Sequence, residues 1–237
     1  MTLHKLPRTK RNALPLLALL VLLTGTICFA QRGYVSKYDM YVGFSNINAP
    51  FVNNLNQPGI GVQFAMVHNR WLESGLDYSV QSGTGPLTAD LLTKSLQMGL
   101  AAALPPGYSL RLRTDVNIQT FAGGTQLTYR RFARAPIFFH PVLTALRIEA
   151  TPRPKDPIQA AIAHALVPSG KKIDLTPGFG FGGGTDLRIS KHLSARMQMD
   201  GAWSHPMNDI LGNGGWIIRA GVGPAFHFGR DINNRAK

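Results

Sequence analysis

Side chains alternate with a period of two from residue 177 to residue 228. In 178–189, glycines and then charged residues occupy every second position, and larger residues occupy all the positions between them except Gly183. The alternation returns in 193–203 and again in 216–228. Because successive side chains of a β-strand point to opposite faces, this pattern predicts strands with one apolar face and one glycine-rich or charged face.

The charged positions of the first two of these strands are spaced to form a pair. If 190–192 form a tight turn, Asp186 lies directly opposite Arg196 on the same face. Opposite charges at that spacing stabilise a pair of strands by about 0.2–1 kcal/mol. The alternation does not decide which face meets water, since a soluble sandwich buries its apolar face and a membrane barrel exposes it to lipid.

The first thirty residues indicate that the protein is exported. Four basic residues precede an apolar run from 13 to 29 that ends in small residues. This is the arrangement of a secretory signal peptide, and we expect cleavage after Ala30 following Sec-type export. An uncleaved membrane anchor is the alternative, but the run is short for a spanning helix and contains Pro15.

Ten stretches of the remaining chain show the alternation or a weaker form of it. It is clearest at 108–119, where apolar residues fall on one face and charged or amide residues on the other. A long interruption at 151–176 contains three prolines and an alanine-rich stretch, 158–166, that could form a short helix. The predicted strands are 38–44, 60–66, 72–81, 95–102, 108–119, 127–132, 137–150, 178–189, 193–203 and 216–228.

The connections between these strands alternate in length along the chain: the even-numbered ones are short and most of the odd-numbered ones are long. The second, fourth, sixth and eighth are tight turns, whereas the first, third, seventh and ninth are long. Only the fifth, at Gly123-Gly124, departs from the rule. Outer-membrane barrels have short periplasmic turns, longer extracellular loops and an even number of strands. We therefore predict an all-β fold, a closed up-and-down antiparallel transmembrane β-barrel of about ten strands, with eight as the alternative.

In such a barrel the apolar face of each strand meets lipid and the polar face lines the lumen. For 108–119 this places Leu110, Leu112, Val116 and Ile118 on the outside. The lumen of so small a barrel is nearly filled by side chains. The predicted lumenal charge network consists of Glu73, Asp77, Arg111, Arg113, Asp115, Asp186, Arg188, Arg196, Asp200 and Arg219. The predicted membrane-interface aromatics are Tyr108, Trp203, Trp216, Phe226 and Phe228.

The C-terminal part of the chain resembles the OmpA-like outer-membrane β-barrel domain family. The matching stretches are 182–188, the 193–200 strand with Arg196, and 219–228, which ends in Phe226-His227-Phe228. The resemblance implies a bacterial outer-membrane location and a last strand that is read by the barrel-assembly machinery. It carries over no catalytic residue. Because such families usually have eight strands, it also implies that 94–120 is an added hairpin.

The domain organisation and the charge follow from these assignments. We expect a signal peptide at 1–30 and one outer-membrane barrel domain at 31–237, with a short tail from 229. Loss of the signal peptide lowers the formal net charge from +13 to +9 and removes Cys28, the one cysteine. The expected partners are outer-membrane lipid and lipopolysaccharide, whose phosphates Lys171 and Lys172 could contact. We expect a monomer, no nucleic acid, no cofactor and no metal.

Three functional classes are compatible with these features. The first is a structural or surface-interaction role for a barrel whose lumen is plugged by charged side chains. The second is a narrow pore for small solutes or ions. The third is an outer-membrane hydrolase with a rim site near His205, since Ser204 and Asp209 are close to it in sequence, although a triad is defined by geometry and not by sequence proximity. A soluble, exported, lipocalin-like binder is a further alternative. The sequence favours the first class and no enzymatic activity.

Overall fold

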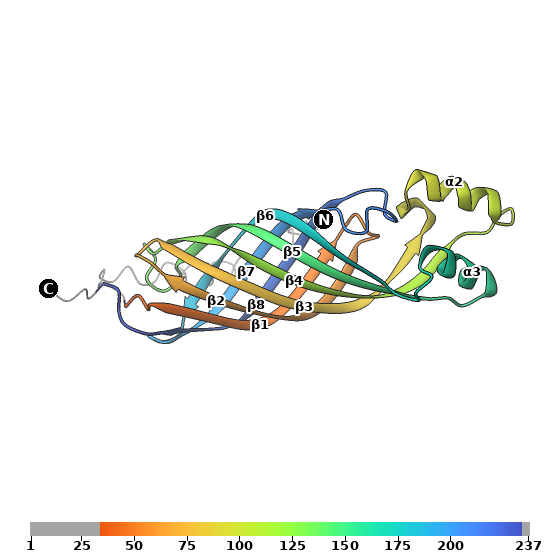
Figure 1. The fold of residues 1–237 in the computed structure, drawn as a ribbon. Helices are drawn as coiled ribbons and strands as arrows, with labels where there is room; N and C mark the ends of the chain where they lie inside the picture. Colours follow the sequence, from red (N-terminus) through yellow and green to blue (C-terminus); the bar gives the residue numbers. More distant parts are fainter. Residues whose placement is uncertain (1–33, 234–237) are drawn as a thin grey trace, which may run out of the picture. The chain divides into compact units, whose positions relative to one another are not determined.

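Eight antiparallel strands close into a barrel in the computed structural model, which describes residues 34–233 (Figure 1). Each strand pairs with its neighbour in the sequence, and the last pairs with the first. The predicted signal peptide and its cleavage site lie outside the described residues. The strands are β1 (Tyr38–Ala49), β2 (Leu55–Val67), β3 (Leu72–Thr88), β4 (Arg111–Tyr129), β5 (Ile137–Arg153), β6 (Lys172–Arg188), β7 (Leu193–Ser204) and β8 (Gly215–Phe228).

The prediction of a closed antiparallel barrel is confirmed, with the alternative count of eight strands. The predicted strand at 95–102 is instead part of helix α2 (Lys94–Ala103). Its residues are mostly Leu, Ala, Gln and Met, which favour helices, and it contains no β-branched residue. The predicted turn at Gly123-Gly124 lies within β4, which runs without a break from residue 111 to residue 129. These two differences account for the two surplus strands.

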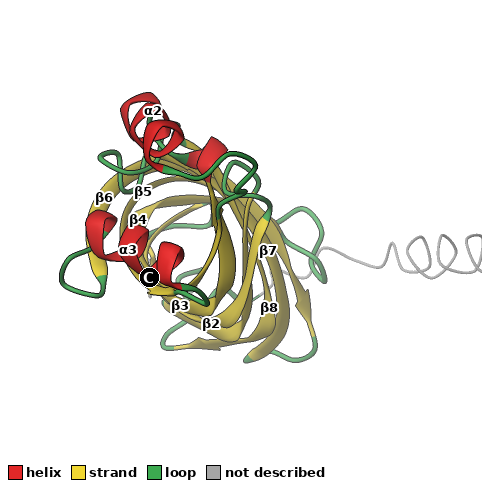
Figure 2. Ribbon diagram, turned by 90° about the vertical axis from the view of Figure 1, so that its right-hand side faces the viewer, coloured by secondary structure: helices red, strands yellow, loops and turns green. Residues whose placement is uncertain are grey.

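Long connections gather at one end of the barrel. A short 3₁₀ helix, η1 (Ala89–Leu91), and α2 lie between β3 and β4, and helix α3 (Pro157–Leu166) lies between β5 and β6 (Figures 1 and 2). Helix α3 matches the predicted short helix. Its N-cap Asp156 accepts a hydrogen bond from the backbone N–H of Gln159 at 2.8 Å, and Pro157 occupies its first turn. No helix in the described part of the chain is long and apolar enough to cross a bilayer.

The opposite end, which we call the tight-turn end, carries four-residue turns at 68–71 and 189–192 and a seven-residue connection at 130–136. Of the connections at the long-loop end, the first is shorter than predicted, because β1 and β2 extend to Ala49 and Leu55 and leave five residues between them. Asn53 and Asn54 adopt φ values of 49° and 52° there, a left-handed conformation that asparagine tolerates better than most residues. The predicted sorting of connection lengths by end therefore holds for the other six connections.

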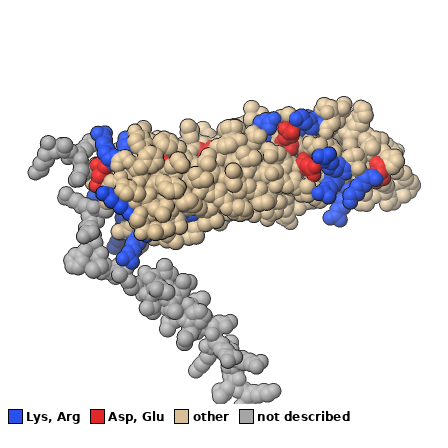
Figure 3. Space-filling view, turned by 90° about the horizontal axis from the view of Figure 1, so that it is seen from below, with Lys and Arg blue, Asp and Glu red and all other residues tan. Residues whose placement is uncertain are grey.

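A belt of apolar side chains surrounds the barrel on the side of the tight turns. Outward positions of every strand contribute to it, and charged side chains gather mostly at the two ends of the molecule (Figure 3). The belt is an inversion of a soluble fold, in which such residues would be buried. Its members include Phe44, Ile60, Phe64, Leu76, Phe121, Leu127, Phe139, Leu143, Phe179, Phe181, Met199, Ile218, Val222 and Phe226.

The first half of β4 is oriented opposite to the prediction. Leu112 and Ile118 are 0% and 2% exposed inside the barrel, whereas Arg111 and Arg113 are exposed on its outer surface. The pairing of β4 with β5 keeps one register throughout, so Phe121 in the belt and Arg113 above it lie on the same outward face. The reason is height along the barrel. This half of β4 extends beyond the apolar belt, and there the inward face is apolar and the outward face is charged or polar.

Candidate functional site

Charged side chains inside the barrel form an ion-pair network that crosses the lumen. Arg196 of β7 is 1% exposed and donates two hydrogen bonds to the Asp186 carboxylate of β6, at 2.7 and 2.8 Å. Its third nitrogen donates to Gln63 Oε1 of β2 at 2.8 Å. The guanidinium also lies 4.9 Å from the centre of the Phe138 ring. The pairing of Asp186 with Arg196 agrees with the register predicted from the sequence.

A second arginine connects three strands at the next level of the lumen. Arg219 of β8 donates to Asp200 of β7 at 2.6 and 3.1 Å, to Ser79 of β3 at 2.9 Å, and to Asp77 of β3. His140 of β5 shares a hydrogen bond with the other oxygen of Asp200 at 2.9 Å. Buried charges are tolerated only when they are paired in this way, because loss of hydration otherwise costs several kcal/mol per ion.

A third level lies nearest the tight turns. Asp39 of β1 shares a hydrogen bond with His227 of β8 at 2.8 Å, and His227 shares another with Ser194 at 2.7 Å. Glu73 of β3 accepts from Thr128 at 2.8 Å and also pairs with Arg130. We call these three levels the ion-pair network. Its charged and imidazole members are Asp39, Glu73, Asp77, Arg130, His140, Asp186, Arg196, Asp200, Arg219 and His227.

The glycines of β6 provide the space that this network occupies. A methyl group added at Gly182 would clash with the Asp200 carboxylate and lie 2.7 Å from His140 Nε2. At Gly184 it would lie 2.7 Å from the Phe138 ring, which stacks over Arg196. The alternating glycines therefore leave room on the lumenal face for buried arginines and carboxylates, and the large apolar residues of β6 are on the outward face.

The other half of the interior is apolar. A cluster of buried aliphatic side chains fills the barrel toward the long loops, and we call it the outer apolar core. It includes the inward side chains of β4 and β5 and is covered by the 205–214 loop and by α3. Its buried members include Ile47, Leu55, Leu92, Leu110, Leu112, Ile118, Leu146, Ile148, Ile162, Met207, Ile210, Leu211 and Ile217.

Six of the ten charges predicted for the lumen belong to the ion-pair network. Arg188 is partly exposed at the tight-turn end, where it donates to the Tyr34 carbonyl at 3.1 Å. Arg111, Arg113 and Asp115 point outward, so their assignment to the lumen was wrong. Asp115 pairs with Arg153 across the outer surface at 2.7 Å. The physical reason is the one given for β4, whose first half stands above the apolar belt.

Four of the predicted interface aromatics lie on the outward face at the ends of β7 and β8. Trp203 and Trp216 pair with each other toward the long loops, and Phe228 pairs with Tyr38 at the tight-turn end. Tyr108 was misplaced, because it lies in the loop before β4, beyond the belt. Its hydroxyl donates to Asp156. Two effects raise the pKa of Tyr108: loss of hydration, which is the larger, and this hydrogen bond to a carboxylate.

The residues considered for a hydrolase do not form a triad. Ser204 donates to the Pro177 carbonyl at 3.1 Å, His205 shares a hydrogen bond with the Leu211 carbonyl at 3.2 Å, and Asp209 pairs with Lys172. No hydrogen bond joins any two of the three within the described residues. Nor do residues 34–233 contain a group of three or more His, Cys, Asp or Glu side chains arranged to hold a metal ion.

Several members of the network were not predicted, although the sequence contained a signal for most of them. Asp39, His140 and His227 each occupy an inward position of a strand, as the alternation of β1, β5 and β8 shows. The parity of Asp39 with Tyr41 and of His227 with Arg219 indicates the lumen for both, whereas 137–150 is apolar on both faces and gives no such signal for His140. Arg130 follows the end of β4, in a turn, and no periodicity indicates where its side chain points.

Comparison with known proteins supports the fold and leaves the family open. Neither the models of known protein families nor the curated proteins contain a match to this sequence. Neisserial surface protein A has a similar solved structure, with a TM-score of 0.55 and 8% sequence identity over 81% of this chain and 98% of that one. At this identity the similarity concerns the fold alone. Membership of the OmpA-like family stays a prediction.

Two further solved structures resemble the chain at lower scores. Ail, the attachment invasion locus protein of Yersinia pestis, was solved with the heparin analogue sucrose octasulfate; it has a TM-score of 0.48 and 8% identity over 82% of this chain and 99% of that one. The outer membrane protein OprG of Pseudomonas aeruginosa has a TM-score of 0.41 and 10% identity, covering 83% and 97%. The neighbours are small outer-membrane barrels.

Proposed function

We propose that the chain is a bacterial outer-membrane β-barrel with a structural or surface-interaction role and a lumen closed by the ion-pair network. The apolar belt supports the membrane location, because closed strands with outward apolar side chains satisfy every backbone group within lipid. A soluble lipocalin-like binder would have to expose the same belt to water. By the usual asymmetry of such barrels, the tight turns face the periplasm and the long loops face outward.

The observation that carries the closed lumen is the direction of the hydrogen bonds that the two buried arginines donate. Arg219 links β8 to β3, and Arg196 links β7 to β2, so both guanidinium groups cross the interior and do not merely follow its wall. An ion entering at this level would have to displace a paired, buried charge. We expect no regular single-channel currents when the purified protein is reconstituted in planar bilayers.

A variant that removes one arginine of the ion-pair network tests whether this network closes the lumen. Arg219→Ala leaves Asp77 and Asp200 facing each other across an emptied volume, and we expect it to produce cation-selective currents. Arg113→Ala, which removes the same charge from the outer surface, is the matched control and should remain silent. Heat-modifiable gel migration verifies that each variant is folded. Steady currents from the unmodified protein would favour a pore.

A specific observation keeps the narrow pore as a second candidate function. Between the ion-pair network and the outer apolar core, Gln57, Gln81, Thr120 and Thr144 bury amide or hydroxyl atoms that have no hydrogen-bond partner among the described residues. Groups of this kind commonly bind water. In a pore, Arg196 and Arg219 would control selectivity, whereas Arg111 and Arg113 lie outside and would not.

We further propose that the outer surface above the belt contacts phosphates of lipopolysaccharide. Arg111 and Arg113 are exposed there and form no ion pair with any described residue, and Lys171 and Arg153 lie nearby with one acidic partner each. Arginine binds phosphate strongly through paired donors. We expect Arg111→Ala with Arg113→Ala to weaken binding to lipopolysaccharide vesicles, and the equivalent loss of Arg70 and Arg131 at the tight-turn end to leave it unchanged.

A further inference from the structure

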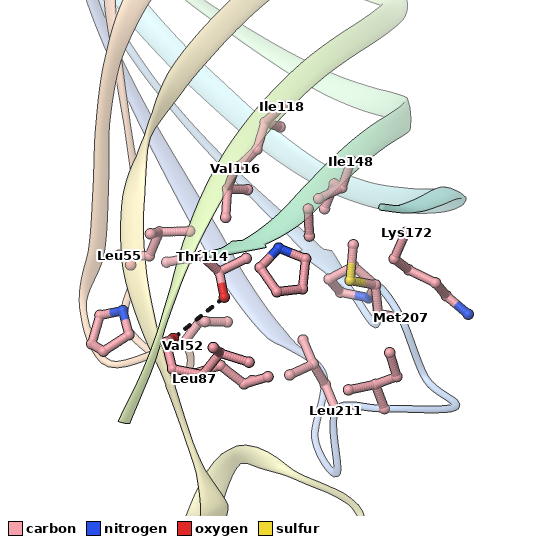
Figure 4. Close-up of a pocket in the computed structure, with 18 of the residues that line it drawn as sticks. Val52, Leu55, Leu87, Thr114, Val116, Ile118, Ile148, Lys172, Met207 and Leu211 are labelled. Atoms are coloured by element: carbon pink, nitrogen blue, oxygen red, sulfur yellow. Dashed lines mark hydrogen bonds between the residues drawn. The ribbon is translucent and has the colours of Figure 1, made fainter. Parts of the chain in front are cut away.

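The outer apolar core contains a cavity of about 100 Å³ (Figure 4). Side chains from several parts of the barrel wall line it, including Leu55 of β2, Ile118 of β4, Ile148 of β5 and Ile217 of β8. Met207 and Leu211, from the loop between β7 and β8, cover it on the long-loop side. Strands therefore form the flanks of the cavity, and a loop lies over it at the mouth of the barrel.

The chemistry of the lining excludes water as the natural occupant. Thr114 and Lys172 are the only polar side chains among the described residues that line the cavity, and both already have partners. The Thr114 hydroxyl donates to the Leu112 carbonyl at 3.4 Å, and the Lys172 ammonium pairs with Asp209. A buried water needs two to four polar partners, whereas apolar cavities stay dry and can bind apolar guests.

We propose that this cavity is a binding site for a small apolar molecule, of the size of one aromatic ring or a short alkyl group. The size follows from the volume, since an engineered apolar cavity of about 150 Å³ in another protein binds benzene or xenon. The affinity comes from transfer of apolar surface out of water, at about 25 cal/mol per Å². Neither the closed lumen nor the surface-interaction role is needed for this binding.

The position of the cavity indicates that the guest is a free molecule and not the chain of a membrane lipid. Val116 and Ala150 line the cavity and are paired across β4 and β5. The next pair along the same two strands, Asn117 and Glu149, points outward. Between β4 and β5 the wall beside the cavity is therefore polar on its outer surface, whereas Ile173 of β6 and Ile218 of β8 are exposed on other parts of the wall.

The cover of the cavity is attached by a small number of polar contacts. The Asp174 carboxylate of β6 accepts from the backbone N–H of Met207, and Lys172 pairs with Asp209. On the other side, the Thr93 N–H donates to the Ile210 carbonyl at 2.9 Å. These contacts join the 205–214 loop to β6 and to the segment before α2, so a guest can enter when this loop separates from either one.

The test uses the full chain in lipid nanodiscs, with methyl groups of isoleucine and methionine labelled for NMR and with benzene as the probe. We expect saturable shifts of the Ile118, Ile148 and Met207 methyl signals. Ala150→Leu fills the cavity and should weaken binding about tenfold or more. Ala145→Leu adds the same atoms to an outward position of the same strand and should bind benzene like the unmodified protein.

A second variant keeps the test decisive if Ala150→Leu does not fold. Ile148→Ala enlarges the cavity, so naphthalene should shift the Ile118 and Met207 signals in this variant but not in the unmodified chain. Phospholipid with a spin label at its chain end distinguishes the source of the guest, and we expect no broadening of Ile118 or Met207. The proposal is overturned if benzene produces no saturable shift, if both leucine variants bind alike, or if the spin-labelled chain broadens these signals.

Discussion

The two halves of the barrel interior use opposite chemistry within one set of strands. Toward the tight turns the interior is ionic and the exterior apolar, and toward the long loops the interior is apolar and the exterior charged. β4 shows the change within a single strand, since Phe121 and Arg113 share its outward face whereas Ile118 and Leu112 lie inside. The arrangement typical of a membrane barrel thus extends only as far as the apolar belt. Beyond it, the same barrel is built like a soluble one.

The largest expected effect comes from leaving one charge of the ionic half without a partner. Arg196→Met removes three hydrogen bonds and leaves Asp186 buried and unpaired, so we expect a loss of about 3–5 kcal/mol in the free energy of unfolding. Arg113→Met, an arginine outside the barrel, should change it by less than about 0.5 kcal/mol. Urea titration of the protein in lipid vesicles measures both.

Replacing the whole pair separates its charge from its packing. Arg196→Met with Asp186→Leu leaves no unpaired ion and restores apolar contact, so most of the lost stability should return. A double variant as unstable as Arg196→Met alone would show that the cost arises from lost packing against Phe138 and not from the uncompensated carboxylate.

The apolar half is tested by truncation of a side chain whose orientation the sequence did not reveal. Leu112→Ala should cost about 2–5 kcal/mol, because Leu112 is fully buried in the outer apolar core. Its neighbour Arg111 is exposed, so Arg111→Ala should have an effect below about 0.5 kcal/mol. If Arg111 were inside and Leu112 in lipid, the order of the two effects would be reversed, and the same urea titration would show it.

The wrong orientation predicted for 108–119 shows how much of the fold the sequence alone could establish. Alternation identified the two faces of most strands, and even the cross-strand pair Asp186 and Arg196, because both depend only on local geometry; it did not do so for 127–132 or 137–150. Alternation does not identify the medium outside the wall, so the strand 108–119, with the clearest pattern of all, was assigned to the wrong side. Its apolar face was long enough to span lipid, and only the positions of its neighbours, such as β3 and β5, reveal that it stands above the belt.

The surplus strands have a different cause. At 95–102 large and small residues alternate by chance within a segment of good helix formers, and helix propensity prevails because no neighbouring strand is present to pair with it. At Gly123-Gly124 the dipeptide resembles a turn, but here glycine permits close approach to a neighbouring strand. A methyl group at Gly124 would clash with the Pro141 carbonyl of β5. Arg130 is the member of the ion-pair network that lies in a turn between strands, so no alternation indicated the direction of its side chain.

A smaller effect is expected where glycine makes room for the ionic half. Gly182→Ala places a methyl group against Asp200 and His140, and we expect a loss of about 1–3 kcal/mol from overpacking. A methyl group added at Gly99 in α2 would have no neighbouring atom within 4 Å, so Gly99→Ala should be neutral or stabilising by up to about 1 kcal/mol. Equal losses in the two variants would argue against a sterically filled lumen.

The smallest expected effect concerns the loop that covers the apolar half. Lys172 and Asp209 are both partly exposed, so Lys172→Ala should lower the free energy of unfolding by no more than about 1 kcal/mol. Its consequence should instead be local, because the pair ties the 205–214 loop to β6. We expect faster hydrogen exchange at the Ile210 and Leu211 amides, which bond within that loop, and unchanged exchange in the ionic half. Lys171→Ala is the matched control, since Lys171 pairs with Glu149 on the outer surface and does not contact the loop. Faster exchange in both variants would mean that the loop responds to the charge of the rim in general, and the Lys172 pair would then have no special part in holding the cavity closed.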